Sequence, residues 1–416
     1  MLILYNIGIK IYHLLIIIYQ HFDPKAHLWV KGRKNLFEKI SNEVDSTSPS
    51  IWFHFASLGE FEQGRPVLER TKESYPTHKI IITFFSPSGY ELRKNYENAD
   101  HIFYLPLDTN DNAEKFVKLI NPSLAIFTKY EFWYHFYYKL NQRNTPLIVI
   151  SSIFRESQPF FKWYGNLNRK ILRFVNHFFV QDETSKKLLA DINLTNVTVS
   201  GDTRFDRVAE NAANPKQFDK VKAFCGNFKI FIAGSTWPED EALIANLLHE
   251  CPEWKFIIAP HEIKSEKLNK LIAITDSDKT IRYSEINNSK ALVQKPDAQV
   301  LIIDNVGMLS ALYQYGDIAY IGGGFGVGIH NTLEAAAFGI PVIFGPNFHN
   351  FREAKALLKL EAGFSIKNSG ELSSLMQKLE NSSLRDEAGN NARRYVEQEK
   401  GATEMIMAYI DQIIQK

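Results

Sequence analysis

Three short segments of the sequence pair a hydroxyl residue with a glutamate three positions later. They are Ser57–Glu60, Ser88–Glu91 and Thr236–Glu239, and each follows an apolar run. The spacing is typical of a capping box, in which the glutamate accepts a backbone hydrogen bond at a helix start. Glu60 also has Gly59 beside it, which leaves space for a ligand at the backbone. The helix dipole favours the ionised carboxylate, which is ready to accept a proton. The sequence therefore leaves two roles open for Glu60, that of a helix cap and that of a general base.

A glycine-rich segment supplies the second candidate site. The apolar run 318–324 ends in three glycines and leads into "GIHNTLEAAAFGIPVIFGP" at 328–346. Asn331 is expected to be the N-cap of a helix, with Glu334 three residues further on. Amide groups at such a helix start suit a phosphate, and Glu334 is placed to accept hydrogen bonds from ribose hydroxyls. The alternative is a capping box with a tight packing turn and no ligand.

The remaining candidates are weaker. Glu131 and Trp133 lie in "TKYEFWYHF", directly after the apolar run 124–128. A carboxylate there can orient an acceptor hydroxyl or stabilise a developing cation, and a plain helix start is the alternative. Asp276-Ser277-Asp278 resembles a metal-binding DxD motif, although its polar surroundings favour a solvated turn. The histidines are scattered and the chain has two cysteines, so no metal is expected.

Short apolar runs alternate with helical patterns along the chain. The runs are rich in Val, Ile and Phe, which is typical of parallel strands buried on both faces. They lie at 51–56, 79–85, 101–106, 124–128, 146–151 and 177–181, and again at 229–235, 255–260, 299–304, 318–324 and 341–346. The polar stretch 208–220 between the two series indicates a linker. Two doubly wound α/β domains are the simplest architecture, and ligands of such sheets bind at the carboxyl ends of the strands.

The first 20 residues are almost entirely apolar and are long enough for a helix to cross a bilayer. Asn6, Lys10, His13 and Gln20 share one face of such a helix, which favours a helix lying in the membrane surface. A core helix inside the protein is the alternative. Basic residues that follow would hold the rest of the chain on the cytoplasmic side; they are Lys25, Lys31, Arg33 and Lys34. The formal net charge of +1 gives no field for a polyanion, so no nucleic-acid partner is expected.

Taken together, these segments resemble a known family. The sequence is similar to the bacterial 3-deoxy-D-manno-octulosonic acid (Kdo) transferases, membrane-associated glycosyltransferases of lipopolysaccharide core assembly. The blocks that carry the resemblance are "FHFASLGE" (53–60), "FFSPSGYE" (84–91), "LPLD" (105–108), "YEFW" (130–133), "GDTRFD" (201–206), "AGSTWPEDE" (233–241), "DNVGML" (304–309), "GIHNTLEAAAFGIPVIFGP" (328–346) and "HNFREA" (349–354). The resemblance extends from the N-terminal apolar helix to about residue 360.

The resemblance implies a GT-B architecture, in which two doubly wound Rossmann-like domains face a cleft. The expected division is a membrane-anchor helix at 1–22, an acceptor-binding domain at 23–210 and a domain at 211–416 that binds CMP-Kdo. The implied reaction moves Kdo from CMP-Kdo to a glucosamine hydroxyl of a lipid A precursor of the lipid IVA type. It proceeds with inversion, without a metal or other cofactor, at the cytoplasmic face of the cell inner membrane.

Residue roles follow from the same resemblance. Glu60 would be the general base, and Glu131 and Arg204 would stabilise the transition state. CMP would be held by Pro260, His261, Val306, Gly307, Met308, Asn331, Thr332, Leu333 and Glu334. The chain departs from the family at several positions: His261 replaces a usual Arg, Met308 a common Glu, Arg204 a Lys, and Tyr134-His135 a Pro-Asn pair.

Two other functions stay open. A UDP-sugar-dependent GT-B glycosyltransferase or a UDP-sugar 2-epimerase would also explain the segment 320–346, although the Ser57–Glu60 block and the N-terminal helix argue against it. A non-catalytic membrane-bound protein that binds lipid or glycan is the third candidate. The joint presence of Glu60, Glu131 and Arg204 argues against that one.

Overall fold

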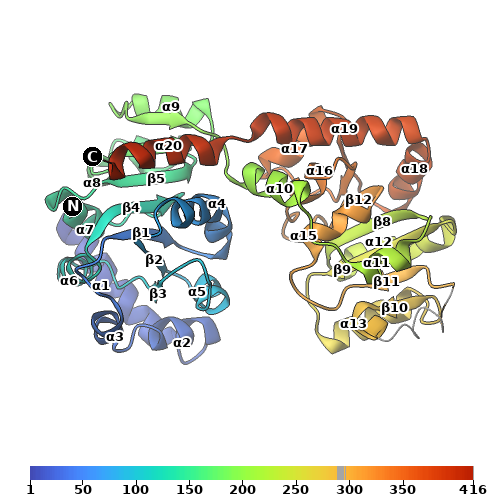
Figure 1. Cartoon of the computed structure of the whole chain (residues 1–416), viewed down its shortest axis with the longest axis horizontal. Coiled ribbons are helices and arrows are strands. Elements are labelled where there is room, and N and C mark those ends of the chain that lie inside the picture. Colours follow the sequence, from blue (N-terminus) through green and yellow to red (C-terminus); the bar gives the residue numbers. More distant parts are fainter. Residues whose placement is uncertain (288–294, 296, 416) are drawn as a thin grey trace. The chain divides into compact units, whose positions relative to one another are not determined.

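The computed structural model describes residues 1–287, 295 and 297–415, and the chain forms two compact units. Unit 1 comprises Met1–Asp206 with Lys400–Lys416, and unit 2 comprises Arg207–Glu399. Each unit contains, in its described part, one parallel sheet of seven strands flanked by helices (Figure 1). The predicted fold of two doubly wound α/β domains is therefore confirmed.

The sheet of unit 1 has the strand order β3-β2-β1-β4-β5-β6-β7. Its strands are β1 Ser50–Phe55, β2 Lys79–Phe84, β3 His101–Tyr104, β4 Pro122–Thr128, β5 Leu147–Ser152, β6 His177–Val180 and β7 Val197–Val199. The strand order reverses between β1 and β4, which lie side by side in parallel with Trp52 opposite Ala125. In open α/β sheets, ligands bind at such a reversal, beyond the carboxyl ends of the strands.

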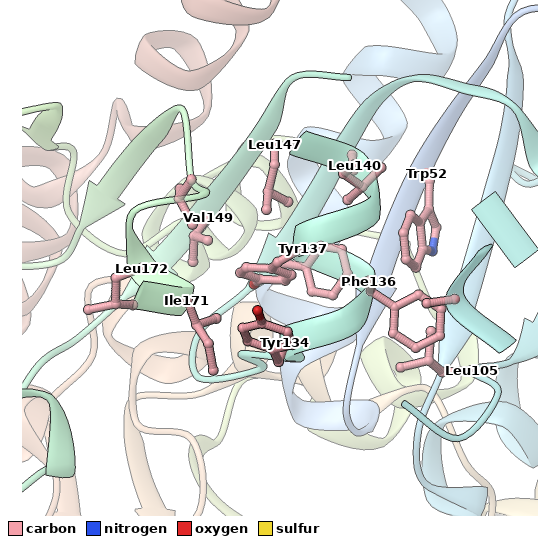
Figure 2. Packing of buried hydrophobic residues seen from close by; sticks show 14 of the residues in the cluster. Trp52, Leu105, Tyr134, Phe136, Tyr137, Leu140, Leu147, Val149, Ile171 and Leu172 are labelled. Atoms are coloured by element: carbon pink, nitrogen blue, oxygen red, sulfur yellow. The ribbon is translucent and has the colours of Figure 1, made fainter. Parts of the chain in front are cut away.

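The helices of unit 1 connect these strands and cover the sheet. They are α1 Leu2–Tyr19, α2 Pro24–Lys31, α3 Leu36–Glu43, α4 Leu58–Ser74, α5 Pro87–Arg93, α6 Asn110–Ile120, α7 Tyr134–Gln142, α8 Asn166–Leu172 and α9 Glu183–Ala190, with a short 3₁₀ helix at Pro159–Phe161. Helix α10, Arg204–Ala213, begins in unit 1 and continues into unit 2. Helix α7 is held firmly, because Phe136, Tyr137 and Leu140 are fully buried in the core beside Trp52 (Figure 2). The ring of Trp52 lies 5.7 Å from that of Phe136. The loop that precedes α7 therefore ends on a rigid support.

Unit 2 repeats the architecture with the strand order β10-β11-β9-β8-β12-β13-β14. Its strands are β8 Lys229–Thr236, β9 Trp254–Pro260, β10 Thr280–Arg282, β11 Val300–Ile302, β12 Ile318–Ile321, β13 Val342–Phe344 and β14 Gly363–Ser365. Its helices are α11 Asp219–Cys225, α12 Pro238–Glu250, α13 Ser265–Ile274, α15 Leu309–Leu312, α16 Leu333–Ala337, α17 Arg352–Lys359, α18 Ser369–Leu379 and α19 Ser382–Glu399, with 3₁₀ turns at Tyr283–Asn287 and Tyr313–Tyr315. Here the reversal lies between β8 and β12.

The C-terminal helix differs from the sequence-based division, which placed the whole range 211–416 in the second domain. Helix α20, Ala402–Ile414, packs against α4 of unit 1 (Figure 1). Its Ile406 and Ile410 side chains are fully buried there. The Asp206 carboxylate accepts hydrogen bonds from Gly401 N at 2.5 Å and from Thr403 N at 2.7 Å, which fixes the start of this helix. The predicted linker 208–220 is also partly helical, because α10 continues to Ala213.

Helix α1 lies on unit 1 with one face and exposes the other. Its 18 residues are long and apolar enough to cross a membrane, and none of them is buried. Leu2 and Tyr5 pack against the core of unit 1. The exposed large hydrophobic side chains of this helix are Ile3, Leu4, Ile7, Ile11, Tyr12, Leu14, Leu15, Ile18 and Tyr19. The alternative of a core helix hidden inside the protein is therefore wrong.

Candidate active site

Glu60 lies one turn into α4, directly beyond the carboxyl end of β1. Its Oε2 atom accepts a hydrogen bond from Ala56 N at 2.5 Å, while the Ser57 side chain makes no capping bond. The capping box predicted for Ser57–Glu60 is thus not formed, because Glu60 accepts from the residue before the N-cap and Ser57 makes no side-chain bond. The other two boxes are shifted along the chain: Ser86 caps α5, and Asp240 accepts from Trp237 N at 2.9 Å.

The electrostatic surroundings of Glu60 raise its pKa to about 7. Burial is the main cause and the neighbouring charge of Glu131 adds to it, whereas the Ala56 hydrogen bond and Lys129 act in the opposite direction. Burial thus opposes the effect expected of the helix dipole, which favours the ionised carboxylate. A carboxyl group with a pKa near neutrality exchanges protons easily at physiological pH, as a general base requires.

Glu131 lies in the loop after β4, the strand next to β1. Its Oε2 atom accepts a hydrogen bond from Trp133 Nε1 at 2.9 Å and lies 3.6 Å from Nε2 of the buried His54. The hydroxyl of Tyr137 donates to the backbone carbonyl of Glu131 at 2.6 Å, which ties the loop to α7. Lys129 begins this loop with φ of +61°, a strained conformation of the kind found at functional sites. The structure thus brings Glu60 and Glu131 together at the strand reversal of unit 1.

Arg204 is the first residue of α10 and is held by Asp202. Its Nε and Nη2 atoms lie 2.9 and 2.8 Å from Asp202 Oδ2, and its backbone N donates to Asp202 Oδ1 at 3.0 Å. Asp202 in turn accepts from Gln63 Nε2 at 3.4 Å, and the Thr203 hydroxyl donates to the backbone carbonyl of Gln63. Arg204 is therefore tied to α4 one turn beyond Glu60.

Sequence reasoning missed the residues that hold these three side chains. His54 is one of the scattered histidines to which the sequence assigns no role, and Asp202 is not among the predicted site residues. A signal was present for both: His54 lies within the "FHFASLGE" block and Asp202 within "GDTRFD". Tyr130 also belongs to this site, because Glu60 and Asp202 are among the charges that help burial to raise its pKa.

In unit 2, part of the predicted nucleotide site forms a real pocket. A cavity of about 160 Å³ lies beyond the carboxyl ends of β8, β9 and β11. Its lining residues are Ser235, Ala259, Pro260, His261, Ile263, Ile303, Asn305, Val306, Gly307 and Leu309. The predicted residues Pro260, His261, Val306 and Gly307 thus surround one space. Met308 does not line it, because its side chain is buried, with 5% exposed, just before α15.

Three rings connect this pocket to the Asn331 segment. The ring of His261 stacks between Trp237, at 4.7 Å, and His330, at 4.5 Å. Trp237 Nε1 donates to His330 Nε2 at 3.1 Å. Burial, together with the charge of His261, lowers the pKa of His330 to about 4, so His330 is neutral at physiological pH and can accept that bond. The predicted residues of the 260 block and the 331 block are therefore neighbours.

The Asn331 segment differs from its prediction in detail. Asn331 Oδ1 accepts from Leu333 N and Asn331 Nδ2 donates to Glu334 Oε1, both at 3.1 Å, so the side chain does cap the helix start. However, the N-cap residue is Thr332, and α16 has only five residues. The side chains of Thr332 and Leu333 are fully buried. Only their backbone groups can therefore face a ligand, and so short a helix has a weak dipole.

The three glycines 322–324 serve packing more than phosphate binding. The amide of Gly322 donates to Gly234 O at 2.9 Å, and that of Gly323 donates to Asp240 Oδ2 at 2.9 Å. A side chain at Gly324 would begin 2.6 Å from the backbone of Gly345. The alternative of a tight packing turn thus describes this part of the segment.

No group of three or more His, Cys, Asp or Glu side chains in the described residues is arranged to hold a metal ion. The Asp276-Ser277-Asp278 motif forms a turn, in which Asp278 N donates to Asp276 Oδ1 at 3.0 Å and Asp276 has φ of +66°.

Comparison with known proteins places this chain among glycosyltransferases. Residues 31–207 match the family 3-deoxy-D-manno-octulosonic-acid transferase (kdotransferase). The chain is 28% identical to the 3-deoxy-D-manno-octulosonic acid transferase of Aquifex aeolicus, with 82% of this chain and 88% of that protein covered. It is 26% identical to a bifunctional glycosyltransferase/methyltransferase of Fusobacterium nucleatum, with 82% of this chain and 54% of that protein covered. The chain thus spans about half the length of that last relative.

The fold has a close counterpart among solved structures. UDP-GlcNAc 2-epimerase from Neisseria meningitidis matches with a TM-score of 0.60 at 15% identity, covering 87% of this chain and 100% of the other. The two sheets and this match define the GT-B architecture, and the relatives define the class as glycosyltransferase. Within that class, the predicted resemblance is confirmed: the chain is a relative of the Kdo transferases.

Proposed function

We propose that this chain transfers Kdo from CMP-Kdo to a glucosamine hydroxyl of a lipid A precursor, as a step of lipopolysaccharide assembly. The observation that carries the proposal is the pair Glu60 and Glu131, which lies at the strand reversal of unit 1. Unit 1 is also the part of the chain that matches the Kdo transferase family.

The proposed reaction is a single displacement with inversion. The acceptor hydroxyl oxygen attacks the anomeric carbon of Kdo, and the bond from that carbon to the CMP phosphate oxygen breaks. Glu60 takes the hydroxyl proton, for which its pKa of about 7 is suited. Glu131 stabilises positive charge that develops on the sugar, and Arg204 stabilises negative charge on the departing phosphate. The products are the Kdo-bearing lipid and CMP.

For the donor, the proposed contacts lie in unit 2. The pocket lined by Pro260, His261, Val306 and Gly307 would hold the cytidine and its phosphate. The backbone groups of Met308, Thr332 and Leu333 and the side chains of Asn331 and Glu334 would add polar contacts. A leaving group with one phosphate develops less charge than a diphosphate, so we propose that the reaction needs no metal.

The acceptor is a lipid, so we propose that the chain works on the cytoplasmic face of the inner membrane. Helix α1 exposes an apolar face on which Ile7, Ile11, Leu14 and Ile18 are each about half exposed or more, at 47 to 59%. Burial of that face in the interfacial region of a bilayer would hold unit 1 at the membrane surface.

Membrane attachment is tested by changing those four residues to Gln and floating the protein on liposomes. The face that contacts unit 1 stays intact in this variant. We expect the wild-type protein to float and the variant to remain in the aqueous fraction. A control that changes Leu92 and Leu360, two exposed leucines outside α1, to Gln should float like the wild type. Flotation of the α1 variant would contradict the attachment.

Catalysis is tested by mass spectrometry of the lipid after incubation with CMP-Kdo and a defined lipid A precursor. The proposal predicts a product with added Kdo and release of CMP. Formation of a product only from a UDP-sugar would instead support the UDP-sugar-dependent enzymes. Binding of CMP or lipid without turnover of any donor would support a non-catalytic binding protein. If UDP raises the melting temperature of the protein more than CMP does, that result would also support the UDP-sugar-dependent enzymes.

A further inference from the structure

Two polar side chains on the inner face of α1 dock on unit 1. The hydroxyl of Tyr5 donates to Asp108 Oδ2, and His135 Nε2 bonds to Asn6 Oδ1 at 2.7 Å. Asp108 follows β3 and His135 lies in the first turn of α7, so α1 connects two parts of unit 1 that are distant in sequence. An exposed anchor helix would need neither bond.

Asp108, which accepts the hydrogen bond from Tyr5, also contacts the start of α7. It is buried, with 1% exposed, and its carboxylate accepts hydrogen bonds from His135 N and Phe136 N, both at 3.1 Å. The N-cap residue of α7, Trp133, provides no side-chain cap of its own. Asp108 therefore satisfies amide groups that the first turn of a helix leaves without partners. Tyr5 holds this distant cap in place.

A second line of contacts runs from α1 to Glu131 itself. The ring of Tyr12 lies 6.1 Å from that of Phe85, and the ring of Phe85 lies 5.0 Å from that of Trp133. Trp133 Nε1 donates to Glu131 Oε2 at 2.9 Å. The orientation of the Glu131 carboxylate thus depends on a tryptophan that is packed, through one intervening ring, against α1.

Both lines of contact end on the same short segment, 131–136, which carries Glu131. We propose that Tyr5, Asn6 and Tyr12 are positioning residues for Glu131, so that the helix with the exposed apolar face also sets the geometry of the candidate active site. The inference rests on the proposed function, because Glu131 must act in Kdo transfer for its position to matter. Misplacement of a catalytic group by about 1 Å costs up to about 10²-fold in rate, so indirect contacts of this kind have measurable effects.

The test measures Kdo transfer in detergent micelles, where membrane attachment is not needed. The double variant Tyr5→Phe/Asn6→Leu removes both polar contacts of α1. We expect kcat to fall by about tenfold or more, while the affinity for CMP, which is bound by unit 2, stays unchanged. Tyr19→Phe is the matched control on the same helix, since Tyr19 is 57% exposed. It should retain wild-type kcat.

A double-mutant cycle separates positioning from a general loss of structure. In a Glu131→Gln background, the change Tyr5→Phe/Asn6→Leu should lower kcat by less than twofold, because the group it positions is already gone. The same tenfold loss in both backgrounds would overturn the inference. Amide hydrogen exchange of the wild type and the variant shows whether the effect is local: faster exchange at His135 and Phe136 with unchanged exchange in β1 and β4 is expected.

The outcomes also distinguish this inference from the proposed function. If the wild-type protein makes no Kdo-bearing lipid, the proposed function is wrong. The inference that α1 positions Glu131 for Kdo transfer is then wrong with it. If the wild type is active and the Tyr5→Phe/Asn6→Leu variant folds with wild-type kcat, the inference is wrong and the proposed function stands.

Discussion

The Nε2 atom of His54 lies 3.6 Å from Oε2 of Glu131, although His54 is fully buried on β1 and Glu131 lies in a loop after β4. Thr83 Oγ1 accepts a hydrogen bond from Trp52 Nε1 at 2.8 Å and lies 2.8 Å from His54 Nδ1. When the Thr83 hydroxyl donates to Nδ1, the proton of neutral His54 lies on Nε2, which faces Glu131 just beyond hydrogen-bond distance. A buried imidazole thus presents a donor to the carboxylate at the strand reversal.

Replacement of His54 by Phe tests this relationship. Burial lowers the pKa of His54 below its usual value of 6.5, so the folded protein binds fewer protons than the unfolded chain. The wild-type protein should therefore lose part of its free energy of unfolding as the pH falls through about 6.5, and His54→Phe should remove that part. We also expect kcat to fall by about tenfold, since Glu131 loses a neighbouring donor. Denaturant unfolding between pH 5 and pH 8, with the exposed His249 changed to Gln as control, measures the first effect.

The effect of Glu60 on the pH dependence of stability should be opposite to that of His54. Its pKa rises from 4.5 to about 7 on folding, so its contribution to stability is present below pH 4.5 and is lost as the pH rises through about 7. Glu60→Gln should therefore raise the free energy of unfolding at pH 8 by up to about 3 kcal/mol and change it little at pH 4. Equal stability of the variant and the wild type at pH 8 would contradict the raised pKa.

We expect Arg204 to stabilise the transition state through its positive charge and through the orientation that Asp202 gives its guanidinium group. Arg204→Ala should lower kcat by about 10²-fold, because negative charge in the transition state loses its partner. Arg204→Lys keeps the charge but cannot contact Asp202 through two nitrogen atoms, so an intermediate loss is expected. Steady-state kinetics on the three proteins gives the comparison. If Arg204→Ala retains wild-type kcat, the arginine has no role in the transition state.

His261 occupies a position where the family usually has an arginine. A guanidinium there can donate to the CMP phosphate and can also stack on Trp237, as the imidazole does. We therefore expect His261→Arg to tighten CMP binding by about tenfold, the worth of one charge-assisted hydrogen bond. Isothermal titration with CMP measures the change. Unaltered affinity would show that the phosphate lies away from position 261.

The sequence predicted eleven of the fourteen strands in the described residues, because each of these is a short apolar run bounded by turn residues, a pattern that depends on local residues alone. It missed β7, β10 and β14, which have three residues each and are too short to show such a pattern. It also placed Glu60 and Glu131 beyond strands β1 and β4, but only the strand order shows that these strands are neighbours. The sequence could not reveal that burial raises the pKa of Glu60, because burial is set by residues distant in the chain. For the same reason it missed the return of α20 to unit 1 and the inward orientation of Met308.

The turnover of Glu60→Gln tests the central claim, that Glu60 is the general base of a Kdo transferase, most directly. Product formation from CMP-Kdo and a lipid A precursor is followed by mass spectrometry, with CMP affinity measured on the same protein. Glu62→Gln on the same helix is the matched control, since Glu62 forms ion pairs with Arg65 and Arg93 away from the backbone of Ala56. We predict a loss of about 10²–10⁴-fold in kcat for Glu60→Gln with unchanged CMP affinity and near-normal kcat for Glu62→Gln. Wild-type kcat in Glu60→Gln would contradict the claim.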